Sequence, residues 1–260
     1  MSNGSGDNRY SLAEQRPLFQ FGSSEQRFES VVHSLLVLFL AFTAGSVLVV
    51  LGNSLLGDAG LTGPILTETV PTALHFLGIL LVATWYLHWR GDHSLIGLRI
   101  PTRRDILIVV LGAVGLIVTI MTLDILFSAY GLEPGENVAV EAGKDNPELF
   151  LYYVPIVLLL NAPAEELLFR GVIQGLFRRA YGVVPAILAA ALIFGFVHYL
   201  AVAGNGGQMV YVTIAFVSGV VLGALYEYTG NLLVPTVVHA IWNSIVYLNL
   251  YAQETVLVAV

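Results

Sequence analysis

The stretch Asn161-Ala162-Pro163-Ala164-Glu165-Glu166-Leu167-Leu168-Phe169-Arg170 places two glutamates and an arginine directly after the apolar run 152–160. Charged groups inside a membrane-spanning segment are costly, so they are usually paired and functional. Later apolar segments carry His198 and the pair His239 and Asn243. This combination of titratable groups and apolar surroundings predicts chemistry inside a membrane.

The composition is that of an integral membrane protein. Of the 260 residues, 57% are hydrophobic and 11% are charged, whereas a soluble domain is about 25% charged. The mean hydropathy is +0.80. The sequence has no cysteine, which excludes disulfides and thiolate nucleophiles. The net charge of −7 argues against a nucleic-acid partner.

Seven apolar stretches are long enough to cross a bilayer, which requires about 20 residues each. They lie near 30–52, 68–89, 105–130, 148–169, 183–202, 208–228 and 232–251. We therefore expect an all-α, polytopic helix bundle with about seven transmembrane helices, surrounded by lipid in the cell membrane. Residues 1–28 are polar and predict a disordered cytoplasmic tail, so the transmembrane domain is expected over 29–260.

The loops between these stretches alternate in charge. One set carries the arginines, namely Arg9, Arg16, Arg27, Arg90, Arg99, Arg103, Arg104, Arg178 and Arg179. The opposite set is acidic, and Lys144 is its only basic residue. Because basic residues mark the cytoplasmic side, we expect the N-terminus inside and, with seven spans, the C-terminus outside.

The two adjacent glutamates are expected to have different environments. Residues four apart on a helix share a face, so Glu166 can pair with Arg170. Glu165 points about 100° away from that face, and an unpaired carboxylate suits a general base. Pro163 predicts either a kink or a fresh helical start capped by Asn161. Taken alone, the motif is equally consistent with a charged cluster at the end of a span.

Two further pairs lie one helical turn apart in later spans. Phe194 and His198 share a face of the fifth apolar stretch. The alternative for His198 is a packing role, because a lone histidine on an apolar helix is more often a packing residue than a catalytic one. His239 and Asn243 share a face of the seventh and can both donate to one oxygen, which is the arrangement that stabilises an oxyanion. The alternative for the second pair is a hydrogen-bonded bridge between helices.

Taken in order, three motifs resemble one family. They are Glu165-Glu166-x-x-x-Arg170, Phe194-x-x-x-His198 and His239-x-x-x-Asn243. The pattern resembles the CAAX protease and bacteriocin-processing family, intramembrane endopeptidases that include the Ras-converting CAAX prenyl protease. The resemblance covers about 145–250, which would be the catalytic core.

The resemblance implies a role for each matched residue. Glu165 and His198 would hold and activate the attacking water, and His239 and Asn243 would stabilise the tetrahedral oxyanion. The supporting residues would be Glu166, Arg170 and Phe194. The implied activity is hydrolysis of a peptide bond in a membrane-associated or prenylated protein or peptide.

Three alternatives stay open at this point. The family has been described both as metal-dependent and as metal-independent, so a zinc-dependent protease is one alternative. We expect no metal or other cofactor, because Asn243 is a poor zinc ligand and His239 has a competing role. The second alternative is a non-catalytic scaffold or immunity-type protein. The third is a transporter using Glu165 and Asp124 as proton sites, although we see no inverted repeat.

Overall fold

The structure is a computed structural model that describes residues 17–203 and 206–258. Within these ranges it is helical, apart from turns, loops and an isolated bridge between Asn137 and Val202. Six of the described helices are long and apolar enough to cross a membrane, which indicates a multi-pass membrane protein. They are α2 (Ser24–Asp58), α3 (Pro64–Arg90), α4 (Arg103–Ala129), α9 (Val183–Val197) continued by the 3₁₀ turn η5 (His198–Ala201), α10 (Gln208–Thr229) and α11 (Leu233–Val258).

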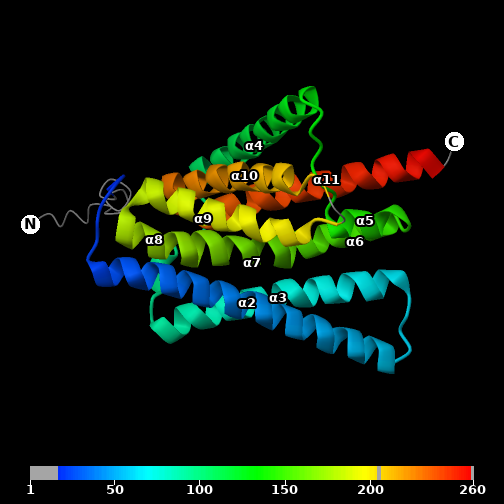
Figure 1. Cartoon of the computed structure of the whole chain (residues 1–260), viewed down its shortest axis with the longest axis horizontal. Helices are drawn as coiled ribbons and strands as arrows, with labels where there is room; N and C mark the ends of the chain where they lie inside the picture. The colour runs from blue at the N-terminus through cyan, green and yellow to red at the C-terminus, as the bar shows by residue number, and fades with distance from the viewer. Residues whose placement is uncertain (1–16, 204–205, 259–260) are drawn as a thin grey trace, which may run out of the picture.

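The expected span 148–169 forms part of a longer helical run over 148–181, which we call the central segment. It consists of α6 (Glu148–Ile156), the π-helix η3 (Val157–Asn161), α7 (Ala162–Glu166), the π-helix η4 (Leu167–Ile173) and α8 (Gln174–Tyr181). The central segment runs between the α2–α3 pair and helices α9, α10 and α11, and it contacts all five (Figure 1). It is additional to the six helices above, and a total of seven spans remains a prediction.

Two wide turns flank the glutamates of the central segment. A proline has no N–H, and its ring clashes with the carbonyl four residues before it. Immediately before Pro163, the N–H of Ala162 bonds to the carbonyl of Val157, five residues back, so the helix is widened there. A second wide turn closes with the N–H of Gln174 bonded to the carbonyl of Phe169. π turns occur frequently at functional sites.

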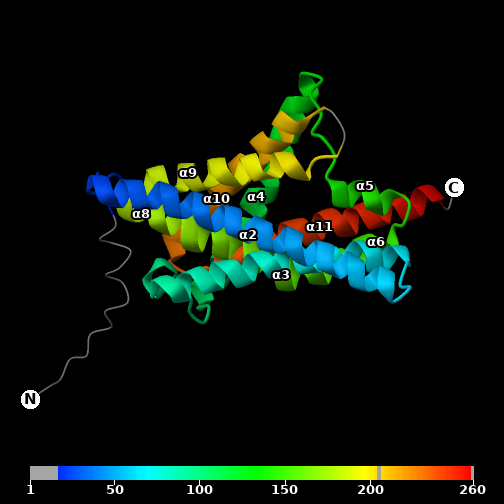
Figure 2. The same cartoon turned by 60° about the horizontal axis from the view of Figure 1, so that its bottom comes forward.

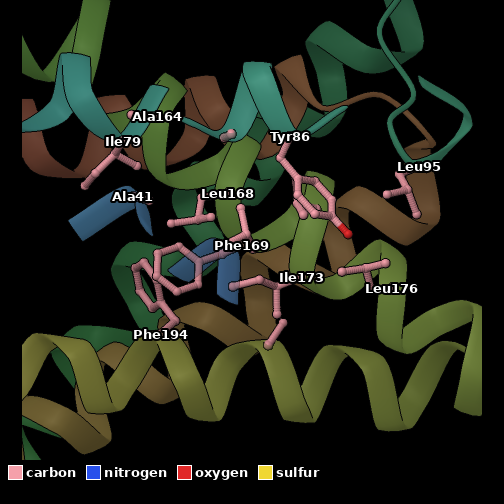
Figure 3. Close-up of a cluster of buried hydrophobic side chains, with 14 of the residues drawn as sticks. Ala41, Ile79, Tyr86, Leu95, Ala164, Leu168, Phe169, Ile173, Leu176 and Phe194 are labelled. Atoms are coloured by element: carbon pink, nitrogen blue, oxygen red, sulfur yellow. The ribbon is translucent and has the colours of Figure 1, made fainter. Parts of the chain in front are cut away.

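The central segment packs through a cluster of buried apolar side chains. Leu168, Phe169 and Ile173 lie between residues of α2, α3 and α9 (Figure 3). The rings of Phe169 and Phe194 meet edge to face, with their centroids 5.0 Å apart. Because lipid tails are as apolar as these side chains, close van der Waals fit holds the helices together. This packing fixes Phe194 and the end of α9 relative to the central segment.

Two glycines let α10 approach its neighbours closely, the central segment at Gly223 and α9 at Gly219. A Cβ added at Gly223 would lie 2.7 Å from Oε1 of Gln174, and one added at Gly219 would lie 3.0 Å from Ala191. Because no side chain covers them, the backbone carbonyls of these two glycines accept hydrogen bonds from the central segment. The carbonyl of Gly219 accepts from Nη2 of Arg170 at 3.4 Å, and that of Gly223 accepts from Nε2 of Gln174 at 3.2 Å.

The expected tail 1–28 differs from the structure over residues 17–28, while residues 1–16 lie outside the described residues. The main chain of Gln20 donates to the carbonyl of Tyr181 at 3.0 Å, and α2 already begins at Ser24. The last carbonyls of a helix lack intrahelical donors, and the extended segment before α2 supplies such donors at the end of α8. The prediction of disorder is therefore wrong for residues 17–28.

The arginine-bearing ends of the helices gather at one end of the bundle. The starts of α2 and α4 and the ends of α3 and α8 lie there (Figure 1). The loop between α4 and α5 (Val138–Lys144) lies toward the other end, where α4 leans away from the bundle (Figure 2). The side of the membrane that each end faces remains a prediction from the charges.

Candidate active site

A cavity of about 710 Å³ lies among the central segment, α3, α4, α9, α10 and α11. Its lining includes Glu165, His198, His239 and Asn243, which are the four predicted catalytic residues. Three different helical elements supply them: α7, the turn η5 at the end of α9, and α11. Phe194 also lines the cavity. The fold thus brings together side chains that are far apart in sequence.

The adjacent glutamates occupy different environments, as the helical spacing indicates. Oε1 of Glu166 accepts hydrogen bonds from Nη1 of Arg170 at 3.0 Å and from Nδ1 of His239 at 2.8 Å. The side chains of Arg170 and Glu166 are 1% and 0% exposed. Glu165 lies on the cavity instead, where its Oε1 accepts from Nδ2 of Asn161 at 2.9 Å. Among the described residues, its buried Oε2 has no hydrogen-bond partner.

His239 connects the buried ion pair to the cavity. Because Nδ1–H donates to Glu166, the lone pair of Nε2 is the acceptor for Nδ2 of Asn243 at 3.1 Å. Nε2 also lies 3.8 Å from Oε2 of Glu165. Joint donation by His239 and Asn243 to an oxyanion therefore requires a second proton, on Nε2. In the structure, Nε2 of His239 lies close to both Asn243 and Glu165.

The ring of Phe194 packs among three charged or titratable side chains. The guanidinium carbon of Arg170 lies 4.4 Å from its centroid. The imidazole centroids of His198 and His239 lie 4.3 Å and 6.1 Å away. Nδ1–H of His198 donates to the carbonyl of Phe194 at 2.7 Å, so Nε2 carries the lone pair of this histidine. Phe194 thus fixes the His198 ring and separates it from His239.

Asn161 is a site residue that the sequence reasoning missed. Of the two alternatives for Pro163, the fresh helical start capped by Asn161 is wrong, because Asn161 has αR dihedral angles and its side chain makes no capping bond. Instead, Nδ2 donates to Glu165 and Oδ1 accepts from Nδ2 of Asn243 at 3.0 Å. The available signal was its spacing, four residues before Glu165 on one helical face. Pro163 obscured this signal by suggesting a break between them.

Two further polar residues on the lining lie outside the predicted set. The ring centroid of Tyr211 is 6.1 Å from that of His198, and its hydroxyl accepts from Nδ2 of Asn137 at 3.0 Å. Asp124, for which the sequence showed no partner, lines the same cavity. No spacing in the sequence connects these residues to the catalytic motifs, because they lie on separate helices or loops.

The donor set does not form a zinc site as it stands. A catalytic zinc usually has three protein ligands and one open position. Among the described residues, no group of three or more histidine, aspartate or glutamate side chains is arranged to hold a metal ion. In addition, both ring nitrogens of His239 already face hydrogen-bond partners. The chemistry derived below therefore uses no metal.

The fold and the site define a class: a helical membrane protein with a carboxylate, two imidazoles and an amide around an internal cavity. These groups can supply the base and the oxyanion donors that peptide-bond hydrolysis needs. Residues 147–245 match the family model described as type II CAAX prenyl endopeptidase Rce1-like. Over these residues the chain is similar to this family of proteases, as its motifs implied. No curated protein and no solved structure matches the chain.

Proposed function

We propose that the protein is an intramembrane endopeptidase that hydrolyses a peptide bond in a membrane-associated or prenylated protein or peptide. The main support is the position of Glu165, His198, His239 and Asn243 on one cavity. These residues fall within the part of the chain that matches Rce1-like endopeptidases. In this proposal the protein is surrounded by membrane lipid, and its partner is the peptide substrate.

In the first step, Glu165 and His198 activate a water molecule. Nε2 of His198 accepts one hydrogen bond from the water and orients it. Oε2 of Glu165 takes the other proton as the water oxygen attacks the scissile carbonyl carbon. The new C–O bond converts the carbonyl oxygen into an oxyanion. The free Oε2 and the unoccupied Nε2 lone pair support these assignments.

In the second step, His239 and Asn243 stabilise the oxyanion. Asn243 donates through Nδ2, and His239 donates through Nε2 when its imidazole carries both protons. The carboxylates of Glu166 and Glu165 lie 2.8 and 3.8 Å from the two ring nitrogens, within reach of the N–H groups of that form. When the C–N bond breaks, the proton on Oε2 of Glu165 passes to the departing amine.

The remainder of the lining favours an apolar substrate. Most of the other lining side chains are aliphatic or aromatic, and they include Phe76, Leu116, Ile120, Leu222, Trp242 and Leu250. Ligand sites with this composition bind through apolar contact, and a few polar groups fix the orientation. A lipidated or hydrophobic peptide segment next to the scissile bond fits such a lining.

A cleavage assay tests the proposal. The purified protein in detergent micelles is incubated with a farnesylated peptide ending in a CAAX sequence, and the products are identified by mass spectrometry. We expect a shortened peptide from the wild type and none from Glu165→Gln. Membrane-peptide termini compared between cells with the wild type and cells with Glu165→Ala extend the test to other substrates. Identical termini and an intact probe would contradict the proposal.

A further inference from the structure

We propose that Asn161 is a positioning residue that aligns the proposed base Glu165 with the proposed oxyanion donor Asn243. The inference rests on the proposed function and adds a residue to it. Asn161 is 7% exposed and lies at the end of the wide turn η3, one helical turn before Glu165. Its amide contacts both partners directly, at 2.9 Å to Oε1 of Glu165 and 3.0 Å to Nδ2 of Asn243.

Asn161 fixes the direction of the Asn243 amide. An ionised carboxylate only accepts hydrogen bonds, so Asn161 must present its NH₂ group to Glu165. The carbonyl oxygen of Asn161 then faces Asn243 and requires a donor there. Asn243 must therefore present its own NH₂ group on this side, which is also the side facing Nε2 of His239. Asn161 thus holds one amide hydrogen of Asn243 and leaves the other on the side of Nε2 of His239, where the oxyanion is expected.

Asn161 also determines which oxygen of Glu165 acts as the base. The bond from Nδ2 of Asn161 occupies Oε1. Oε2 is left free, 3.8 Å from Nε2 of His239. The proton from the attacking water is therefore received on the same side as the oxyanion donors. Loss of Asn161 would release both constraints while leaving Glu165, His239 and Asn243 present.

The first test separates positioning from binding. With the farnesylated CAAX peptide as the probe, we expect Asn161→Leu to lower kcat by about 10–100-fold, as loss of a positioning partner typically does. KM should stay near that of the wild type, because both polar groups of the Asn161 amide are held by Glu165 and Asn243. Asn249→Leu is the matched control, an exposed asparagine on α11. A raised KM with unchanged kcat in Asn161→Leu would overturn the proposal.

The second test asks whether Asn161 acts through Asn243. In the Asn243→Ala background, Asn161→Leu should lower kcat by a smaller factor than in the wild type, since only the contact with Glu165 is then left to lose. An equal factor in both backgrounds would show that Asn161 does not act through Asn243 and would overturn the proposal.

A third measurement separates the failure of this proposal from the failure of the proposed function. If the wild type leaves the probe intact and the membrane-peptide termini are identical, the proposed function fails, and the positioning claim is decided by stability. Thermal unfolding midpoints in micelles are measured for the wild type, Asn161→Leu, Asn243→Ala and the double variant. We expect the double variant to lose less than the sum of the two single losses. Additive losses would show that the two amides are not coupled and would overturn the proposal.

Discussion

The central segment carries two similar ion pairs with different consequences, an inner pair near its middle and an outer pair at its C-terminal end. In the inner pair, Arg170 contacts Glu166, and His239 extends the pair toward the cavity. In the outer pair, Arg178 contacts Glu227 at 2.9 Å, and Nη2 of Arg178 donates a hydrogen bond to the carbonyl of Leu95. Both pairs are largely buried, so burial alone does not mark a site. The inner pair differs because its third partner is a titratable ring facing an internal cavity.

The largest expected effect comes from replacing a glutamate by glutamine near each of the two ion pairs. Glu165→Gln should abolish cleavage and leave folding intact, because it removes the base and keeps the shape. Glu227→Gln should leave kcat unchanged, since Glu227 pairs with Arg178 away from the four predicted catalytic residues. Cleavage of the farnesylated peptide and the unfolding midpoint are measured for both. Equal losses of activity in the two variants would remove the distinction between the two ion pairs.

The next effect concerns the stability of the inner pair. Arg170→Ala should destabilise the protein by about 3–5 kcal/mol, because it leaves Glu166 as an unpaired buried charge. Arg178→Ala should cost less, since its side chain and that of Glu227 are 11% and 6% exposed and partly hydrated. Expression level and unfolding in detergent measure both variants. A greater loss in Arg178→Ala would reverse the comparison.

A smaller effect is expected from the oxyanion donor. Removal of one such donor typically lowers kcat by about 10²–10³, or about 2.7–4 kcal/mol. Asn243→Ala should show a loss of this size with KM nearly unchanged, because the donor acts mainly in the transition state. Steady-state kinetics with the farnesylated peptide provide the measurement. A rise in KM alone would place Asn243 in substrate binding.

The smallest effect lies at the surface of the C-terminal end of the central segment, where Arg179 pairs with Asp92. Hydrogen bonding by Arg179 lowers the pKa of Asp92 from its ordinary value of 3.8. Because the pKa of Asp92 is lower in the folded state, its ionised carboxylate stabilises the fold at pH values above the ordinary pKa. This stabilisation is lost as the pH falls through the folded-state pKa. At neutral pH, Asp92→Asn should cost about 0–1 kcal/mol, as exposed pairs do. The difference from the wild type should vanish in acid; a difference that persists there would contradict the ion-pair explanation.

Local rules predicted the helical class and the separate residue pairs, and the family resemblance implied that Glu165, His198, His239 and Asn243 form one site. The spacing of four residues placed Glu166 beside Arg170 and His239 beside Asn243, as the structure has them. The contact between Glu166 and His239 could not be predicted, since it depends on how α11 packs against the central segment. The contribution of Tyr211 to the lining depends in the same way on the position of α10.

Two errors arose from standard uses of local signals. Pro163 suggested a break, but the wide turn η3 absorbs the proline and keeps Asn161 on the same helical run as Glu165. The polar composition before residue 29 suggested disorder, but backbone donors there are used by the carbonyls at the end of α8. The first signal was overridden by a local widening of the helix, and the second by a hydrogen-bond requirement elsewhere in the fold.

Metal dependence tests the central claim most directly, because the account assigns water activation to Glu165 and His198 alone. The purified wild type is chelated exhaustively, its zinc content is measured, and cleavage of the farnesylated peptide is followed before and after. We predict substoichiometric zinc and unchanged turnover. Stoichiometric zinc, with activity lost on its removal and restored on its return, would contradict the account and favour a zinc enzyme.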